Sequence, residues 1–236
     1  MANQEFYEAL FKNFWIDVDR TSLVEDPNSM FGDAETFAWL VRTVRPEEII
    51  EIGSWKGHSA NYMIDVCREN AINSRIVCVD TFLGGPEHWL LPGAFETLHR
   101  KNGQPTILNG FLANTIARRN TDHVFPFCLD STAASVVFAH FGFKADMVFV
   151  DAAHDYDAVI RDITNYYPLL SSEGVMFGDD YQFKPVADAV HYCAEKLGLE
   201  VLVHARKWIF MNEALVRKCT LSNMQLRKSF EGWIHP

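Results

Sequence analysis

The sequence predicts an α/β fold: one doubly wound, mostly parallel sheet with helices on both faces and a C-terminal antiparallel strand. Three observations predict it. Short apolar runs alternate with amphipathic segments long enough to form helices. Four of the five runs read as parallel strands end in Asp, and the first carries Glu51 near its end. Two further apolar runs, LEVLVHA and RKWIFMN, follow one another directly and are expected to close the sheet as an antiparallel pair.

The first 46 residues predict a helical segment ahead of the sheet. The stretch QEFYEALFKNFW places Phe6, Leu10 and Phe14 on one helical face. Asp33 is a candidate cap for a second helix, whose apolar residues recur at spacings of three and four. That helix is expected to end before Pro46.

Five parallel strands separated by helices follow this segment. The third strand contains Pro126, which cannot donate to a ladder and therefore indicates a position near an edge of the sheet. The helix after the fifth strand is expected to stop at Gly198. The predicted parallel strands are EEIIEIG (47–53), RIVCVD (75–80), HVFPFCLD (123–130), ADMVFVD (145–151) and EGVMFGDD (173–180).

The chain of 236 residues is expected to form a single domain around residues 47–210. Residues 83–121 are a long insertion after the second strand and are predicted to form a lid over the ligand site. The tail, residues 212–236, has scattered apolar side chains and is expected to pack either on its own domain or on a partner subunit. The oligomeric state, including a homo-oligomer, is left open by the sequence.

Composition excludes several classes of partner. The formal net charge is −10 and the basic runs are short, so binding to nucleic acid or to an anionic membrane is not expected. The N-terminal residues do not resemble a signal peptide, and every apolar run is too short to span a bilayer. The five cysteines show no CxxC pairing, which favours free thiols in a reducing compartment. The sequence thus predicts a cytoplasmic protein.

The segment EIGSWKGHS, which joins the first strand to a helix, is the strongest ligand signal. A dinucleotide fingerprint requires glycine where this loop has Trp55, which argues against NAD or FAD. The spacing of Gly53 and Gly57 instead suits S-adenosylmethionine, which has no phosphate. Glu51 is placed to meet the ammonium group of that cofactor. Ser59 and the helix amides are placed to hold its carboxylate.

Further cofactor contacts are expected at the ends of the next two strands. Asp80 ends the second strand, where a carboxylate can accept hydrogen bonds from both ribose hydroxyls. Asp130 and Ser131 end the third and are candidates to contact the adenine edge. Ser54, inside the first loop, completes the predicted cofactor set. Taken singly, each of these residues also fits a turn or a cap.

Three carboxylates are predicted to gather at neighbouring strand ends. Asp151 ends the fourth strand, while Asp179 and Asp180 end the fifth. Such a group repels itself unless a cation neutralises it, and oxygen ligands suit Mg²⁺ or a similar divalent ion. Capping of the following helix is the alternative role for the pair, but Pro185 indicates that this helix begins later. His154, three residues past Asp151, is a candidate proton acceptor near neutral pH.

Together these motifs resemble those of a Rossmann-like class I S-adenosylmethionine-dependent methyltransferase. They are similar to the metal-dependent O-methyltransferases, of which catechol O-methyltransferase is an example, and to the group of macrocin O-methyltransferase and cephalosporin hydroxylase. The resemblance covers about residues 47–210. The first-loop pattern of this family is acid, x, Gly, x, aromatic, x, Gly, x, Ser, and the matching residues here are Glu51, Gly53, Trp55, Gly57 and Ser59.

The resemblance also implies roles at the acidic end of the sheet. Asp151, Asp179 and Asp180 match the metal-binding positions of the family, and His154 stands where catechol O-methyltransferases have a lysine base and macrocin-type relatives a histidine. The implied reaction moves a methyl group to a hydroxyl of a small molecule, a sugar or another natural product, and leaves S-adenosylhomocysteine. Asp151 and His154 would be catalytic, with His88 and Trp89 of the insertion as candidate acceptor contacts.

Two other functions remain open from the sequence. One is a hydroxylase-like relative of the same fold, for which the chain shows no motif of two histidines and one carboxylate. The other is a non-catalytic module that binds S-adenosylmethionine. The acidic cluster with His154 speaks against the second alternative, because a simple binding protein has no use for three close carboxylates.

Overall fold

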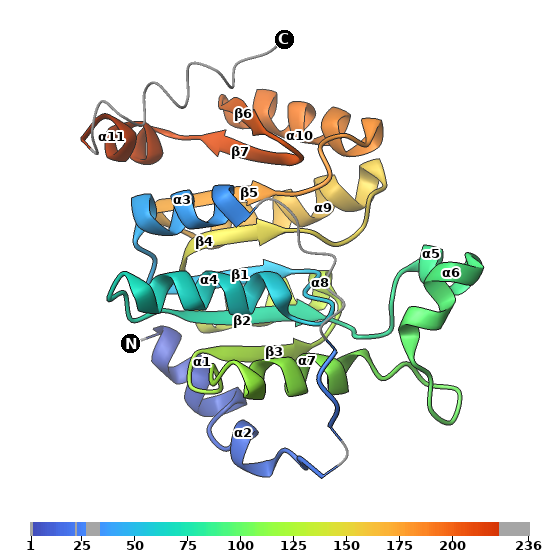
Figure 1. The fold of residues 1–236 in the computed structure, drawn as a ribbon. Helices are drawn as coiled ribbons and strands as arrows, with labels where there is room; N and C mark the ends of the chain where they lie inside the picture. The colour runs from blue at the N-terminus through green and yellow to red at the C-terminus, as the bar shows by residue number, and fades with distance from the viewer. Residues whose placement is uncertain (1, 22, 27–33, 222–236) are drawn as a thin grey trace.

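A seven-stranded sheet forms the centre of the protein, with the strand order β3-β2-β1-β4-β5-β7-β6 (Figure 1). The computed structural model describes residues 2–21, 23–26 and 34–221. The strand β7 runs opposite to the other six strands, so the predicted fold class is confirmed. The strands are β1 (Glu48–Ile52), β2 (Arg75–Asp80), β3 (Val124–Cys128), β4 (Ala145–Val150), β5 (Leu170–Gly178), β6 (Glu200–His204) and β7 (Lys207–Met211).

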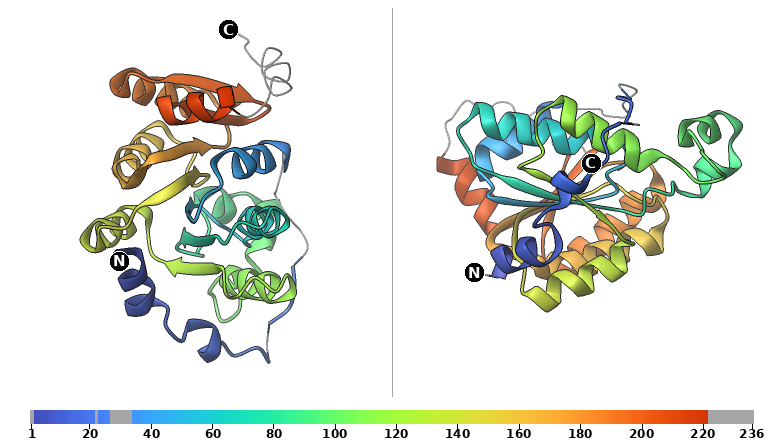
Figure 2. Two further views of the ribbon diagram at one scale, coloured as in Figure 1. Left: turned by 90° about the vertical axis from the view of Figure 1, so that its left-hand side faces the viewer. Right: turned by 90° about the horizontal axis from the view of Figure 1, so that it is seen from below.

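Helices cover both faces of this sheet, as the two turned views in Figure 2 show. Helices α3 and α4 contact each other on one face, as do α8, α9 and α10 in turn on the other. The first layer consists of α3 (Ala34–Val44), α4 (His58–Glu69), α7 (Ile107–Ala117) and α11 (Glu213–Leu221). The second layer consists of α1 (Ala2–Leu10), α8 (Ser131–Phe141), α9 (Tyr156–Tyr166) and α10 (Lys184–Leu197).

Alternation along the strands divides the interior into two hydrophobic cores. Ile49 and Phe149 point into the core beneath α3 and α4, whereas Ile50 and Val148 point into the core beneath α8 to α10. Because successive side chains of a strand point to opposite faces, a strand buried on both sides must be apolar throughout. This explains why the central strands read as continuous apolar runs.

Several local expectations are confirmed. β3, which contains Pro126, is an edge strand, and Pro126 pairs with Cys78 on its inner side. β4 and β5 are parallel neighbours. Helix α10 begins at Lys184 with Pro185 in its first turn and ends at Gly198, whose φ is 68°. Asp179 and Asp180 therefore do not cap that helix.

The N-terminal segment departs from its predicted pattern. Helix α1 ends at Leu10, and the short helix α2 (Phe14–Asp17) follows a turn. Leu10 is consequently 39 % exposed, and Tyr7 and Phe11 join Phe6 in the core instead. The error arose because one helical period was extended through a turn. Asp33, the predicted cap of the next helix, lies outside the described residues.

The long insertion divides into two parts with different roles. Residues 83–106, here called the arm, project beyond the carboxyl ends of the strands (Figure 1). The remainder is mostly α7, the ordinary crossover helix between β2 and β3, which the sequence analysis missed. The predicted tail also begins as a helix, α11, in which Leu215 is fully buried, and its residues beyond 221 lie outside the described part. The arm contains α5 (Pro86–Leu90), α6 (Pro92–Phe95) and a 3₁₀ turn (Glu96–Leu98), and a second such turn lies at Tyr167–Leu169.

Two expectations from composition can be compared with the structure. All five cysteines are free thiols. Among the described residues, no helix is both long enough and apolar enough to cross a membrane.

Candidate functional site

The loop after β1, residues 53–57, is here called the glycine loop. Its backbone turns sharply, with positive φ at Gly53 (84°), Trp55 (48°) and Gly57 (76°). A Cβ on Gly53 would lie 2.0 Å from the main-chain oxygen of Asp151, because the chain leaving β4 passes directly against it. The expectation was that Gly53 lets a ligand approach. In the structure the close neighbour of Gly53 is the backbone of the adjacent strand, so the glycine joins the loop to the Asp151 region.

Glu51 lies fully buried at the end of β1, beneath the glycine loop. Its Oε1 accepts a hydrogen bond of 2.5 Å from Ser59 on α4. Its Oε2 and the Oγ of buried Ser54 have no partner of hydrogen-bond geometry, although Ser54 is close enough to lower the pKa of the acid. Burial dominates and raises the pKa of Glu51 from 4.5 to about 7. Unpaired buried polar atoms are costly, so each requires an explanation.

Asp80 at the end of β2 holds the glycine loop in place. Its Oδ2 accepts from the backbone N–H of Trp55 at 2.8 Å, and its Oδ1 accepts from the N–H of Phe82 at 2.7 Å. Burial raises the pKa of Asp80, while these backbone hydrogen bonds lower it. A carboxylate has about four acceptor positions, so two bonds leave capacity for ribose hydroxyls. The predicted ribose contact stays a prediction.

Asp130 and Ser131 lie after β3, at the start of α8. The carboxylate of Asp130 caps that helix by accepting from the N–H of Ala133 at 3.0 Å, and the residue is otherwise exposed. The Ser131 hydroxyl donates to Asp162 at 2.6 Å. Both side chains thus have structural roles at the same edge as Asp80, and the predicted adenine contacts stay a prediction.

Asp151, His154 and Asp180 form a compact group, here called the acid–histidine cluster, in which one ligand atom from each lies within 4.8 Å of the others. His154 Nε2 is 2.8 Å from Asp180 Oδ2. This hydrogen bond, more than any other contact, raises the pKa of His154 above its usual value. Burial, followed by the negative charges of Asp179 and Asp180, raises the pKa of Asp151 well above its usual value.

Asp179, the remaining carboxylate of the predicted set, is bound by two basic side chains of the protein, and its role as a metal ligand stays a prediction. Its two oxygens accept from Arg206 Nε at 3.0 Å and Nη2 at 2.9 Å, and Oδ2 is 3.1 Å from Lys207 Nζ. Burial raises the pKa of Asp179, but the hydrogen bonds from Arg206 and the charge of Lys207 outweigh it and leave the pKa below its usual value. In this arrangement Asp179 is neutralised by the protein, and His154 takes the third place in the cluster.

The sequence analysis overlooked Arg206 and Lys207, although a signal was present. Lys207 begins an apolar strand, and its side chain is fully buried with its ammonium 4.6 Å from the centre of the Phe37 ring. Because β7 is antiparallel to β5, its first residue lies at the edge where β5 ends. A lysine at the start of the predicted antiparallel strand could therefore have been placed beside Asp179.

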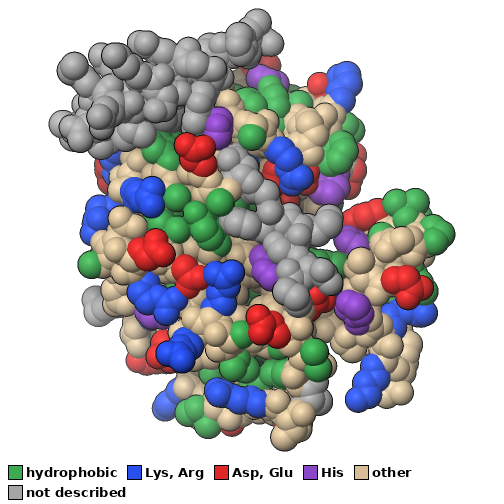
Figure 3. Space-filling model, in the orientation of Figure 1, with side chains coloured by type: hydrophobic (Ala, Val, Ile, Leu, Met, Phe, Trp, Pro, Cys, Tyr) green, Lys and Arg blue, Asp and Glu red, His purple; other side chains and the backbone are tan. Residues whose placement is uncertain are grey.

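The arm approaches both the glycine loop and the cluster. The rings of Trp55 and His88 stack with their centres 4.3 Å apart and an angle of 25° between their planes. The charge of Glu87, on the same short helix as His88, contributes to the raised pKa of His154. In Figure 3 the arm stands out from the body of the molecule with a notch between them. The notch lies beside the carboxyl edge of the sheet.

Of the two predicted acceptor contacts in the arm, His88 faces the glycine loop and Trp89 packs within the arm itself. Trp89 Nε1 donates to the carbonyl oxygen of Leu83 at 2.9 Å, and its ring lies against Phe95. Phe183 is a neighbour that the sequence analysis missed. It is exposed, and its ring centre is 5.3 Å from that of His154, so it offers an apolar surface beside the cluster.

A pocket of about 790 Å³ lies at the opposite edge of the sheet, where the parallel strands begin. Its lining includes Glu48, Arg75 and His123. Glu48 pairs with Arg75 and accepts from Tyr7 at 2.9 Å, and His123 contacts the Ser74 carbonyl oxygen at 2.8 Å. Glu48 and Arg75 thus bind each other and His123 binds the backbone, whereas the acid–histidine cluster lies at the carboxyl edge.

A doubly wound sheet with a glycine loop after its first strand and an acid–histidine cluster after its fourth and fifth belongs to the α/β class that binds ligands at the carboxyl ends of its strands. The chain belongs to the methyltransferase domain family, whose model matches residues 50–181. None of the curated proteins matches the sequence.

Solved structures with the same fold include several methyltransferases. The O-methyltransferase NovP is 20 % identical with a TM-score of 0.54, covering 76 % of this chain and 78 % of NovP. The calicheamicin methyltransferase CalS11 is 16 % identical with a TM-score of 0.56, covering 77 % and 79 %. An O-methyltransferase from Bacillus cereus, in complex with S-adenosylhomocysteine (SAH), is 12 % identical with a TM-score of 0.54, covering 89 % and 98 %.

Proposed function

We propose that this protein is an S-adenosylmethionine-dependent O-methyltransferase that uses a divalent cation and acts on a hydroxyl of a small molecule. The observation that carries the proposal is the position of the acid–histidine cluster. The cluster lies at the carboxyl edge of the sheet, where the glycine loop follows β1. The backbone of Asp151 lies directly against Gly53. A cofactor held by that loop and an acceptor held by the cluster would therefore be neighbours. The family match supports methyl transfer over the hydroxylase-like alternative.

The cofactor end of the site is suited to a ligand with an ammonium group and no phosphate. Glu51 offers a buried oxygen without a partner, and Ser54 offers a hydroxyl beside it. The conformation of the glycine loop depends on a tryptophan with positive φ, so it lacks the open glycine backbone on which a pyrophosphate would lie. These features favour S-adenosylmethionine.

The donor atoms of the cluster fit a divalent cation. Asp151 and Asp180 supply hard oxygen ligands, as Mg²⁺ or a related divalent ion prefers, and His154 lies beside them. A bound cation would offset the carboxylate charges, bind the acceptor hydroxyl and lower the pKa of that hydroxyl. The raised pKa of Asp151, to which burial contributes most and the charges of Asp179 and Asp180 next, is consistent with this fit.

The protein's own residues would then position the acceptor and accept its proton. His154, whose Nε2–H donates to Asp180, would accept the hydroxyl proton at Nδ1 as the oxygen attacks the methyl carbon, and the carbon–sulfur bond would break to leave SAH. Holding the two reactants in line can contribute on the order of 7–11 kcal/mol. Phe183 and the arm would exclude water from the cluster. A sugar hydroxyl is the preferred acceptor, because CalS11 is named as a TDP-rhamnose 3′-O-methyltransferase.

Calorimetry tests the cofactor assignment. We expect S-adenosylmethionine and SAH to bind with micromolar dissociation constants. We also expect binding at pH 8 to be accompanied by less proton release than binding at pH 6, because the ammonium stabilises ionised Glu51, whose pKa of about 7 leaves it mostly protonated at pH 6. Absence of binding by both compounds would refute the proposal at its first step.

The cluster is tested by manganese binding, followed by electron paramagnetic resonance. We expect Asp151→Asn to weaken Mn²⁺ binding by at least tenfold, because it removes one of two carboxylates. Glu173→Gln serves as the control, since Glu173 is exposed, pairs with Arg217 and lies on β5 before the buried end of that strand. Equal Mn²⁺ affinity in wild type and Asp151→Asn would exclude the cluster as the cation site.

A further inference from the structure

The glycine loop contains a buried lysine whose partner comes from a distant part of the chain. The side chain of Lys56 is only 3 % exposed, and its Nζ forms an ion pair with Oδ2 of Asp26. A buried ammonium group is strongly destabilising unless an opposite charge lies beside it. The conformation of Lys56 therefore depends on a residue that precedes the sheet altogether.

The backbone of Asp26 is fixed to the same loop by Asn114 of α7. Asn114 Oδ1 accepts from the Asp26 N–H at 2.9 Å, and its Nδ2 donates to the carbonyl oxygens of Asp26 at 3.0 Å and Lys56 at 2.9 Å. His58 Nε2 is 3.0 Å from the same Asp26 carbonyl oxygen. One buried amide thus joins the Asp26 segment and the glycine loop at defined positions.

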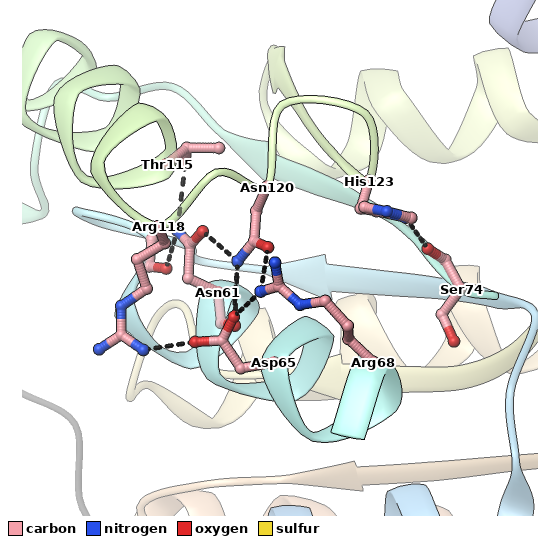
Figure 4. Close-up of polar contacts among 9 residues, drawn as sticks. Asn61, Asp65, Arg68, Ser74, Thr115, Arg118, Asn120 and His123 are labelled. Atoms are coloured by element: carbon pink, nitrogen blue, oxygen red, sulfur yellow. Dashed lines mark hydrogen bonds and ion pairs between the residues drawn. The ribbon is translucent and has the colours of Figure 1, made fainter. Parts of the chain in front are cut away.

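The frame that carries these contacts is itself held by buried polar groups (Figure 4). Asn61 of α4 donates to the Gly57 carbonyl oxygen at 2.7 Å and to Thr115 of α7 at 3.1 Å. Asn120 donates to Asn61 Oδ1 at 3.0 Å. Helices α4 and α7 are therefore fixed to one another. A displacement of Asp26 would act on Lys56 and the loop, since the surrounding helices are held independently.

Asp26 also reaches the arm. Its Oδ2, which pairs with Lys56, is 3.3 Å from Nε2 of His99. His99 follows the 3₁₀ turn of the arm and has a φ of 45°, an uncommon conformation for a residue other than glycine. A single carboxylate therefore contacts the loop expected to bind the cofactor and the arm that approaches the acid–histidine cluster.

We propose that Asp26 is a positioning residue that holds Lys56, and with it the glycine loop, in the conformation that binds S-adenosylmethionine. This inference rests on the proposed function. The loop turns through three residues with positive φ, and Asp80 binds the backbone at its start, at Ser54 and Trp55, before Lys56. Without Asp26 the Lys56 ammonium must reach solvent, and the loop must open to let it do so.

Binding of SAH, measured by calorimetry, tests the proposal in three variants. We expect Asp26→Asn to weaken binding by at least tenfold. The double variant Asp26→Asn/Lys56→Met should recover binding to within about threefold of wild type, because methionine fills the buried path without a charge. Glu173→Gln, which breaks an exposed ion pair far from the loop, should bind like wild type. Wild-type affinity in Asp26→Asn would overturn the proposal, as would a double variant no better than Asp26→Asn.

Hydrogen exchange of the ligand-free protein separates this inference from the proposed function. We expect the amides of residues 54–58 to exchange at least tenfold faster in Asp26→Asn and to return towards wild type in the double variant. If the exchange follows this pattern but wild type binds no SAH, the cofactor assignment fails while the positioning of the loop by Asp26 is supported. If wild type binds SAH but exchange is the same in all variants, the positioning role is excluded. Urea unfolding curves verify that each variant is folded.

Discussion

Gly53→Ala is expected to destabilise the protein by more than about 4 kcal/mol, a loss in the range reserved for severe backbone strain or packing conflict. Two effects add. A φ of 84° is unfavourable for alanine, and the new Cβ would lie 2.0 Å from the Asp151 oxygen and 2.7 Å from the Ala152 Cα. Both neighbours are backbone atoms just past the end of β4, where the Asp151 N–H donates to the Ile52 carbonyl oxygen, so they cannot rotate away. The measurement is the free energy of unfolding in urea.

Gly103→Ala is the matched control for this prediction. Gly103 has a φ of 80°, almost that of Gly53, but a Cβ there would meet no atom within 4 Å. The control is therefore expected to lose only the conformational cost of a left-handed alanine, roughly 1–2 kcal/mol. If the two variants lost equal stability, the close contact between Gly53 and the Asp151 backbone would not contribute to the cost of Gly53→Ala.

Glu51→Gln is expected to stabilise the ligand-free protein at pH 8 relative to wild type, by up to about 3 kcal/mol more than at pH 4.5. The pKa of Glu51 is about 7 in the folded protein and 4.5 in the absence of burial. Between these values the folded state keeps a proton that the unfolded state loses. The contribution of Glu51 to wild-type stability must therefore fall as pH rises from 4.5 to about 7. Above that pH this contribution stays constant. Glutamine, which is neutral throughout, lacks this dependence.

The comparison of wild type with Glu51→Gln removes the titration of Glu51, together with its smaller electrostatic couplings to Asp80 and Asp151. Urea unfolding at pH 5, 6.5 and 8 measures it, with Glu173→Gln as an exposed control expected to change stability by less than about 1 kcal/mol at each pH. If the difference in unfolding free energy between wild type and Glu51→Gln were the same at every pH, the raised pKa of Glu51 would be contradicted. The same variant should bind S-adenosylmethionine more weakly, since it loses the charge expected to meet the ammonium group.

Much of the fold could be predicted because its signals are local. A strand buried on both faces is apolar throughout, and the helices between strands show their own period. Pro126 predicted an edge strand because proline has no N–H to donate to a neighbouring strand, and this is a property of the residue itself. Errors occurred where the pattern of one helix continued, in the sequence, across a turn into the next helix. Leu10 was placed on one helical face with Phe6 and Phe14 because the helical period was read through a turn that ends α1.

The candidate site was predictable to the level of the sheet edge, but not to the level of individual contacts. Parallel strands bring their ends to one edge, so acids at strand ends must lie near each other there. The contacts that each acid makes depend on neighbouring side chains that the hydrophobic periodicity of the sequence does not reveal. Asp179 binds Arg206 and Lys207, and His154 lies in one cluster with Asp151 and Asp180.

By itself, the sequence determined which segments are strands, which edge of the sheet carries the acidic groups and which loop has the spacing for a cofactor, because these follow from residue type and short-range order. The tertiary structure alone decided that Asp179 is neutralised by the protein, that Gly53 is required by the backbone of Asp151, and that Lys56 is held by Asp26. Such contacts join residues that are far apart in the chain. They are fixed by strand register and by the need to compensate buried charge, and both exist only once the chain has folded.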